Sequence, residues 1–330
     1  MVPMRLRRFG RTGWQVGEVG YGMWGIGGGP GGWTGGDEGE GRDALRLAVS
    51  QGCDFFDTAW IYGRGVSEQL LGGLHKEHPG QRLRLATKIP PLDRRWPPRH
   101  DARFDEVFPD AHVDEYVDLS LANLGVDRID LLQYHVWEDA WAKDEQWLAQ
   151  AARLKREGRV DALGISVNRW EPANVLAALE SGLVDVVQVI YNIFDQAPED
   201  ELFPACELHD VAVIARVPFD EGTLTGTLTL DSRWPEGDWR NGYFVPENLA
   251  ASVERAERLR AVVPEGMTMP ELALRFVLQH PAVSTVIPGM RRPSHVRANL
   301  AVSDGVPLPG ELMAELRRHR WDRVPTGWSR

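Results

Sequence analysis

A regular alternation of short apolar runs with segments of helical spacing constrains the fold more than any other feature. The apolar runs predict strands at 19–24, 53–57, 83–89, 129–136, 160–166, 184–190, 211–217 and 283–287. The segments between and after them predict helices at 43–50, 67–74, 112–124, 146–156, 171–180, 200–209, 249–262, 271–279 and 294–301. Parallel strands need crossover connections, so this alternation predicts a parallel α/β sheet. Eight such units in 330 residues suit a closed (β/α)8 TIM barrel better than an open sheet.

The remaining segments complete the predicted barrel. No shift in composition marks a boundary, so a single domain over residues 1–330 is expected. An N-terminal extension with a turn near 10–13 is predicted to plug the bottom of the barrel, and a C-terminal helix near 310–318 to pack on its side. Long loops follow the first, third and seventh strands, at 25–41, 90–111 and 219–248. Barrel enzymes carry their chemistry on such loops, at the C-terminal ends of the strands.

Composition excludes several classes of protein. The 37 basic and 48 acidic residues give a net charge of −11, which argues against general nucleic-acid binding. No apolar stretch approaches the ~20 residues of a membrane span, and the basic start MVPMRLRR is not followed by an apolar signal region. Two cysteines cannot form a disulfide framework, so a cytoplasmic protein is expected. His75 and His78 have metal-like spacing but no third ligand nearby, and no metal is expected.

One glycine motif matches a dinucleotide-binding fingerprint but is better interpreted as a loop. Residues 20–25 read G-Y-G-M-W-G, a literal match to the dinucleotide-binding fingerprint directly after the first strand. In a Rossmann fold a helix would begin inside this motif, but here the chain continues as IGGGPGGWTGG, which disfavours a helix. The motif therefore predicts a loop at the mouth of the barrel.

Four residues that can act together in proton transfer stand at neighbouring strand ends. The segment FDTAWIYG at 56–63 places Asp57 at the end of the second strand and Tyr62 in the following loop. Lys88 and His135 stand at the ends of the third and fourth strands. Each residue alone has an ordinary structural explanation, such as a loop cap, a solvated side chain or a core histidine. Their coincidence at adjacent strand ends favours an active site.

The chemistry of these four groups is complementary. A phenol has a pKa of about 10 and donates its proton poorly near neutrality, and a neighbouring ammonium lowers that pKa. A carboxylate fixes the ammonium, while an imidazole orients a carbonyl oxygen. Together they form an acid that can protonate an alkoxide as hydride reaches the carbon.

At these positions the chain resembles the aldo-keto reductase superfamily, from about Arg7 to Ala301. Asp57 and Tyr62 match the family's D-T-A-x-x-Y-G segment, Lys88 its T-K, and His135 the histidine after its fourth strand. The resemblance implies a (β/α)8 barrel that uses NADPH, or less often NADH, without metal. It also implies hydride transfer to a carbonyl with Tyr62 as general acid.

The resemblance also implies positions for the cofactor. Ser166 matches the family's G-x-S, with the asparagine one residue later than usual, and Arg216 matches a branch in which arginine replaces an aromatic residue that stacks on the nicotinamide. Arg291 follows the last strand and is suited to a 2′-phosphate, although many relatives have a basic residue where His295 stands. The full set of expected cofactor residues is Gly22, Met23, Trp24, Ser166, Asn168, Gln188, Arg216, Pro218, Gly289, Arg291, His295 and Asn299.

The 13 tryptophans suggest the character of the substrate. Many fall at or after strand ends, on the predicted active-site face, where flat aromatic rings suit the C–H faces of a sugar or an aromatic carbonyl. The expected substrate contacts are Trp24, Trp60, Trp137, Trp234 and Trp239. A tryptophan-lined mouth is equally explained by well-packed loops.

The predicted function is therefore NADPH-dependent reduction of an aldehyde or ketone, small and polar and favouring a sugar. An NAD(P)-dependent sugar dehydrogenase working in the oxidative direction is the alternative, and a non-catalytic redox-sensing or regulatory subunit is more remote. A glycoside hydrolase on the same barrel needs two facing carboxylates, and only Asp57 can be placed in the pocket. The expected partner is a small molecule, and the sequence leaves open whether the chain is a monomer or a homo-oligomer.

Overall fold

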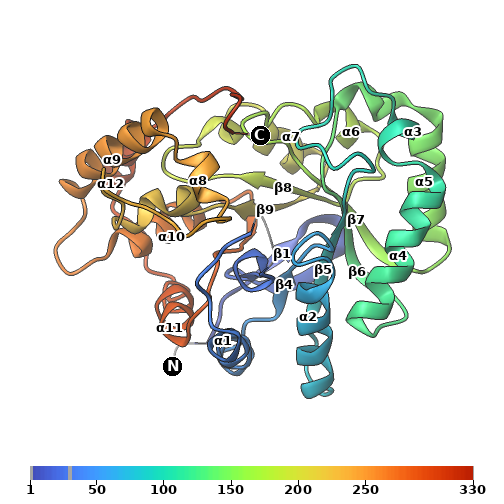
Figure 1. Ribbon diagram of the computed structural model, residues 1–330, viewed down its shortest axis with the longest axis horizontal. Helices are drawn as coiled ribbons and strands as arrows, with labels where there is room; N and C mark the ends of the chain where they lie inside the picture. Colours follow the sequence, from blue (N-terminus) through green and yellow to red (C-terminus); the bar gives the residue numbers. More distant parts are fainter. Residues whose placement is uncertain (1–2, 29–31, 330) are drawn as a thin grey trace.

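Eight parallel strands form the centre of the molecule (Figure 1). The computed structural model describes residues 3–28 and 32–329. The strands follow chain order around the sheet: β3 (Tyr21–Gly22), β4 (Phe55–Asp57), β5 (Arg84–Ile89), β6 (Ile129–Tyr134), β7 (Val160–Ser166), β8 (Val186–Ile190), β9 (Ala212–Arg216) and β10 (Val283–Val286). Parallel bridges from Val19 to Val286 and from Gly22 to Gly289 join the two edges of the sheet. The predicted (β/α)8 barrel is confirmed.

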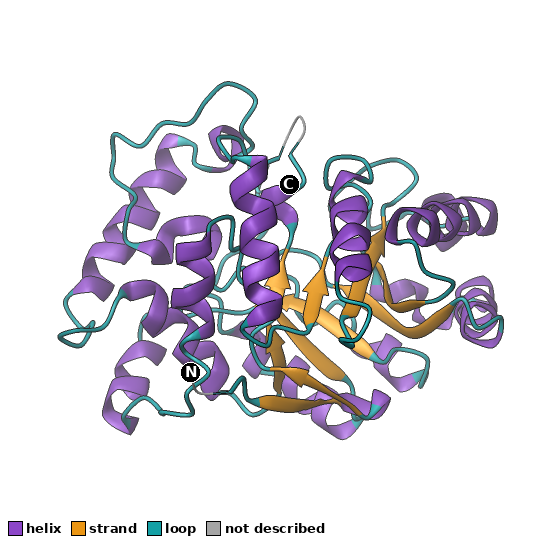
Figure 2. Cartoon of the chain, turned by 90° about the horizontal axis from the view of Figure 1, so that it is seen from below, coloured by secondary structure: helices purple, strands orange, loops and turns teal. Residues whose placement is uncertain are grey.

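Helices alternate with the strands and lie outside them (Figures 1 and 2). They are α1 (Glu38–Ser50), α2 (Val66–Glu77), α3 (Phe104–Val107), α4 (Asp110–Leu124), α5 (Glu145–Arg156), α6 (Leu176–Glu180), α7 (Leu202–Leu208), α8 (Arg240–Tyr243), α9 (Pro246–Arg260), α10 (Met269–Gln279), α11 (Pro293–Leu300) and α12 (Gly310–Arg317). Short 3-10 helices occupy Gly10–Thr12, Trp24–Ile26, Asp139–Lys143, Ala197–Glu199 and Asp220–Thr225.

Two helices differ clearly from their predicted bounds. Helix α1 begins at Glu38 rather than at 43, because the Asp37 side chain accepts a hydrogen bond from the Glu40 amide and caps the helix. Helix α6 covers only the end of the predicted 171–180 segment. Asp139, which begins the short 3-10 helix after β6, accepts hydrogen bonds from the amides of Ala177 and Ala178 at 2.7 and 3.1 Å, so the helix begins there.

The long loops are partly ordered into helix. Helix α3 and the start of α4 lie within the predicted loop at 90–111, while α8 and the start of α9 lie within that at 219–248. The long loop at 25–41, which follows the first predicted strand, includes residues 29–31, and these lie outside the described part of the chain.

An N-terminal hairpin plugs the barrel, as predicted. Strands β1 (Leu6–Phe9) and β2 (Trp14–Gly17) pair antiparallel. Phe9 and Val16 are fully buried against inward-facing apolar residues near the start of the barrel strands. This apolar floor consists of Phe55, Ala86, Leu131, Ala162, Val186, Ala212 and Ile214, and the same cluster extends to Ile287, which follows the end of β10.

Barrel closure depends on a glycine at position 22. A Cβ atom there would lie 2.6 Å from the carbonyl oxygen of Ile287, whereas one at the paired Gly289 would meet nothing within 4 Å. We expect Gly22→Ala to destabilise the protein by about 1–3 kcal/mol through this overpacking. Thermal unfolding measures the loss, with Gly289→Ala as the matched control. Equal melting temperatures for the two variants would contradict the expectation.

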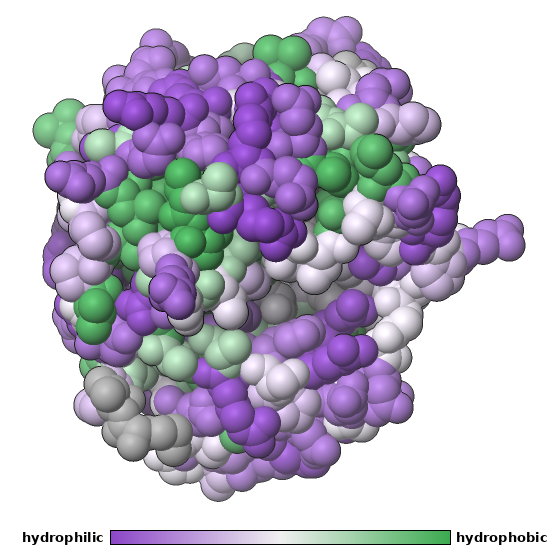
Figure 3. Space-filling model, turned by 90° about the vertical axis from the view of Figure 1, so that its left-hand side faces the viewer, coloured by the Kyte–Doolittle hydropathy of each residue, from purple (hydrophilic) through white to green (hydrophobic). Residues whose placement is uncertain are grey.

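The surface over α9 and α12, on the left-hand side of Figure 1, is largely hydrophilic, with apolar residues in separate patches (Figure 3). Across residues 3–28 and 32–329, no helix has both the length and the apolar character that a membrane crossing requires.

Candidate active site

The structure brings the four predicted catalytic side chains together at the C-terminal end of the strands. The Nζ atom of Lys88 lies 2.5 Å from Oδ1 of Asp57 and 3.4 Å from the hydroxyl oxygen of Tyr62. It also donates to the carbonyl oxygen of Thr58 at 2.8 Å. The rings of Tyr62 and His135 meet edge to face, with centroids 5.9 Å apart. Strand order explains this arrangement, because β4, β5 and β6 are hydrogen-bonded neighbours.

Burial and charge set the protonation of the central pair. Asp57 and Lys88 are 2% and 1% exposed. Burial alone would lower the pKa of Lys88, but the adjacent Asp57 carboxylate outweighs it, so the pKa of Lys88 is raised and the ammonium stays charged.

Tyr62 differs from the sequence-based expectation. Desolvation raises the pKa of its phenol above the ordinary value, and the nearby Asp57 charge adds to this rise. Lys88 lowers the same pKa, as expected, but does not overcome the burial. The expectation of a net lowered pKa was wrong because the sequence does not show how dry the site is. Tyr62 is therefore protonated at neutral pH.

His135 is a neutral imidazole. Burial lowers its pKa well below the ordinary value, and the positive charges of Lys88 and Arg216 lower it further. Its Nδ1 atom is buried and has no hydrogen-bond partner among the described residues. Trp96, from the loop after β5, packs edge to face against the imidazole with ring centroids 5.6 Å apart. One N–H of the ring can thus serve as a neutral hydrogen-bond donor.

Several expected cofactor residues lie around the same opening. Ser166 ends β7, and Gly22 faces Gly289 where the barrel closes. Arg216 ends β9, where its guanidinium donates to the carbonyl oxygen of Val167 at 2.8 Å, while its buried Nε has no partner among the described residues. Burial, with the neighbouring Arg169 as a second cause, lowers the pKa of Arg216 to about 10, so it remains charged.

The remaining expected cofactor positions lie nearby in the fold. Met23 and Pro218 are buried, the former fully. On α11, His295 is exposed and Asn299 is buried. Arg291 lies further out, where it donates to the carbonyl oxygen of Thr34 at 2.9 Å and stacks over the ring of Trp33.

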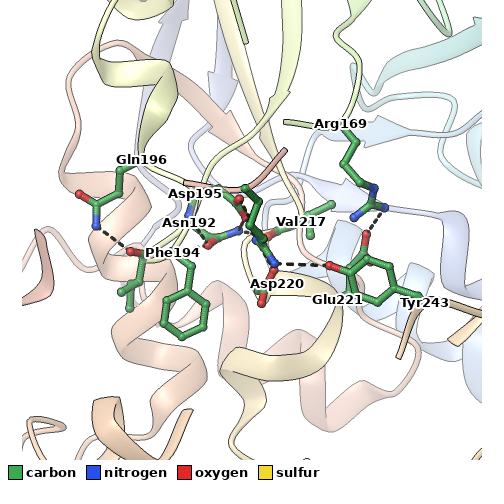
Figure 4. A network of polar contacts seen from close by, with 11 residues as sticks. Arg169, Asn192, Phe194, Asp195, Gln196, Val217, Asp220, Glu221 and Tyr243 are labelled. Carbon is green, nitrogen blue, oxygen red and sulfur yellow. Dashed lines mark hydrogen bonds and ion pairs between the residues drawn. The ribbon is translucent and has the colours of Figure 1, made fainter. Parts of the chain in front are cut away.

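Ion pairs brace the loop after β9 (Figure 4). Arg169 pairs with Glu221 at 2.6 Å, and Asn192 donates to Asp195 at 2.9 Å. Arg323, from the C-terminal segment, pairs with both Asp195 and Asp220. The backbone here adopts left-handed conformations at Val217, Asp220 and Glu221. These contacts compensate the strain and fix the loop that begins at Arg216.

Three predicted site residues have other roles in the structure. Asn168 donates to the carbonyl oxygen of Trp137 at 2.7 Å and to Glu171 at 3.0 Å, and it accepts from the Trp137 amide, so its amide braces two loops instead of facing a cofactor. Trp137 is fully buried among aromatic core residues and cannot contact a substrate. Trp60 packs against Tyr116 of α4, with ring centroids 4.8 Å apart. Spacing placed these residues at strand ends but could not show which way they point.

The other predicted tryptophans form an aromatic wall. Trp24 stacks near Tyr62 with centroids 6.2 Å apart, and Trp239 lies 4.9 Å from Trp24. Trp33 contacts both Trp24 and Trp239. Trp234 stacks on Phe244, with ring centroids 5.1 Å apart. The loops after β3 and β9 therefore meet beside the tetrad through indole rings.

Sequence reasoning missed Gln133 and gave Gln188 only a cofactor role. The Nε2 atoms of both side chains donate to Oδ2 of Asp57, at 3.0 and 2.8 Å. A signal for Gln133 exists in the sequence, because it is the polar inward-facing residue of an otherwise apolar strand end, two positions before His135. Trp96, against His135, was not among the predicted substrate contacts either.

Among residues 3–28 and 32–329, no three or more His, Cys, Asp or Glu side chains are grouped so that they could hold a metal ion. Fold and site together define a barrel with a buried lysine–carboxylate pair, a protonated phenol and a neutral imidazole at its mouth.

Comparisons with known proteins agree with this class. A sequence model of the Aldo/keto reductase family matches residues 18–320. An NADH-specific methylglyoxal reductase of Escherichia coli is 30% identical over 306 residues, which cover 88% of this chain and 91% of that protein. The holo form of an aldo-keto reductase from Bacillus halodurans superimposes with a TM-score of 0.74 at 26% identity, covering 99% of this chain and 100% of that one. A Klebsiella pneumoniae aldo-keto reductase in complex with NADPH gives a TM-score of 0.67 at 25% identity, over 96% and 95% of the two chains.

The chain belongs to the aldo/keto reductase family. It is accordingly an NAD(P)H-dependent oxidoreductase, and carbonyl reduction is the activity that its family supports.

Proposed function

We propose that this protein reduces a small polar aldehyde or ketone to an alcohol with NADPH, and that Tyr62 is the general acid. The observation that carries the proposal is the contact of Lys88 with both Asp57 and the Tyr62 hydroxyl, beside the neutral ring of His135. The raised pKa of Tyr62 favours the reductive direction, because reduction needs the protonated phenol and oxidation needs the phenolate.

Each side chain has a distinct task in this reaction. Bound NADPH supplies hydride to the carbonyl carbon. Tyr62 gives its proton to the carbonyl oxygen as negative charge develops there, and the ammonium of Lys88 stabilises the phenolate that remains. Asp57 keeps Lys88 charged and in place. His135 donates a hydrogen bond to the carbonyl oxygen as a neutral imidazole, which fixes the substrate against the phenol.

The residues around the opening fit a dinucleotide. The buried Nε of Arg216, which has no partner within the described residues, is a donor suited to the nicotinamide end. Gly289 leaves open space beside the backbone, because a Cβ atom there would meet nothing within 4 Å. Arg291 is suited to a 2′-phosphate at the adenosine end. The Klebsiella relative binds NADPH and the Escherichia coli relative is NADH-specific, so NADH is the alternative cofactor.

The mouth of the barrel is suited to a small substrate. Trp24 and Trp96 approach the tetrad from two loops, so a short carbonyl compound can stack on an indole while its oxygen faces Tyr62. A sugar aldehyde suits the same surface, and the relative named as a methylglyoxal reductase extends the range to short dicarbonyls.

A panel of methylglyoxal, sugar aldehydes, aliphatic aldehydes and ketones, followed at the NADPH absorbance band, tests the proposal. We expect NADPH oxidation with at least one short polar carbonyl. Absence of turnover with every compound, with NADPH and with NADH, would overturn the proposed activity.

Cofactor preference is tested at Arg291. We expect Arg291→Met to raise KM for NADPH by about 10-fold or more through loss of a charge-assisted hydrogen bond, with little change for NADH. Arg292→Met is the matched control, because Arg292 is exposed and lies 3.5 Å from Glu40 on α1. If both variants change the KM for NADPH equally, Arg291 is not the phosphate-binding residue.

A further inference from the structure

A second, polar layer lies in the barrel directly above the apolar floor. Side chains two residues apart on a strand share a face. On four strands, the residue two positions after a floor residue therefore also points into the barrel and forms this layer. Its members are Asp57, Lys88, Gln133 and Gln188, two positions beyond Phe55, Ala86, Leu131 and Val186. None of the four is more than 2% exposed. Asp57 therefore carries its charge in a dry environment and depends on protein donors.

The two glutamines complete the surroundings of the Asp57 carboxylate. Oδ1 is held by Lys88, while Oδ2 accepts from Nε2 of Gln133 at 3.0 Å and of Gln188 at 2.8 Å. Gln188 also donates from Nε2 to Oε1 of Gln133 at 3.0 Å. Because a carboxylate can only accept, both amides must turn their NH2 groups toward Asp57, which fixes their orientation.

Neighbouring strands leave space for this arrangement. Gln133 pairs in register with Lys88 on one side and with Gly164 on the other. A Cβ atom at Gly164 would lie 3.0 Å from Cγ of Gln133 and equally close to the carbonyl oxygen of Val186. The glycine thus admits the long glutamine side chain into the layer.

We propose that Gln133 is a positioning residue for the reaction: its amide holds Oδ2 of Asp57 so that Oδ1 stays on Lys88, and Lys88 stays beside Tyr62. The inference rests on the proposed function, in which Lys88 stabilises the Tyr62 phenolate. Gln133 touches neither substrate nor cofactor in this role. Hydrogen bonds to an ionised group stabilise its charged form, so the amide strengthens the ion pair on which the acid depends.

The charged and titratable groups that face this layer are limited. Lys88 and Tyr62 approach from β5 and from the loop after β4, and His135 from the end of β6. Arg216 acts electrostatically on Asp57 from β9, and Glu68 acts on Lys88 from α2. The Gln133 amide does not titrate and neither does a methionine, so a changed pH profile in Gln133→Met reports on these groups.

Gln133→Met tests the proposal by removing the amide while keeping the side-chain length. We expect kcat to fall about tenfold to a hundredfold, because a ~1 Å misplacement of a catalytic group costs up to about 10²-fold. The dissociation constant for NADPH should stay unchanged. The acid limb of the pH profile of kcat/KM should shift to higher pH by about one unit. A shift of this size is the effect of one lost hydrogen bond to a charged group.

Gln133→Glu gives the opposite pH dependence. A protonated glutamic acid can still donate to Asp57, whereas an ionised one repels it. We therefore expect this variant to be most active at low pH and to lose activity as the pH rises. It also provides a second test if Gln133→Met folds poorly.

Gln150→Met is the matched control. Gln150 is an equally buried glutamine that bonds Tyr134 and Asp110 away from the tetrad. A kcat and an acid limb in Gln133→Met that match those of the control would overturn the proposal. If the wild type reduces no carbonyl, the proposed function fails separately. The crystal structure of Gln133→Met then decides, because an unmoved Asp57 carboxylate would overturn the positioning role.

Discussion

We expect Tyr62→Phe to lower kcat for carbonyl reduction by about 10²–10⁴-fold, the contribution of a positioned general acid. The variant removes one hydroxyl that accepts from Lys88 at 3.4 Å and keeps the ring that packs against His135 and Trp24. NADPH affinity should therefore stay close to that of the wild type. Steady-state kinetics and NADPH fluorescence separate the two quantities.

The pH dependence of the wild type gives the same test a second readout. Burial, opposed by Lys88, raises the pKa of Tyr62, so the phenol stays protonated across the neutral range. Reductive kcat/KM should fall only above about pH 10, the ordinary pKa of tyrosine, because the phenol keeps its proton below that pH. The reverse oxidation needs the phenolate and should rise with pH over the same interval.

Tyr116→Phe is the control, because its hydroxyl contacts Arg94 and not the tetrad. If Tyr62→Phe retains the kcat of this control, another group is the acid.

The fold and the tetrad could be predicted because both depend on local patterns. Strand–helix alternation leads to parallel strands, and parallel strands place residues at their ends side by side. Asp57, Lys88 and His135 could therefore be brought together without knowledge of any contact.

Features that depend on distant contacts could not be predicted. The start of α6 is set by Asp139 from another loop, and Trp137 is buried by helices that precede and follow it in the chain. The net pKa shift of Tyr62 depends on how much water the loops exclude. The role of Gln133 could be recognised only from the arrangement of side chains across the barrel, because its partner Asp57 lies on a strand two positions away in the sheet.

The second large effect concerns the ion pair beneath Tyr62. We expect Lys88→Met to destabilise the protein by about 3–5 kcal/mol, because it leaves the buried Asp57 carboxylate without its counter-charge. Arg42→Met removes an exposed partner of Glu38 on α1 and should cost only about 0–1 kcal/mol. Urea unfolding measures both changes.

A double variant separates the structural from the catalytic role of the pair. Asp57→Asn combined with Lys88→Met leaves no unpaired charge in the polar layer, so much of the lost stability should return. Turnover should not return, because no ammonium remains to stabilise the Tyr62 phenolate. Recovery of kcat together with stability would mean that the pair only supports the fold. Recovery of stability alone would mean that the reaction requires the charge of Lys88.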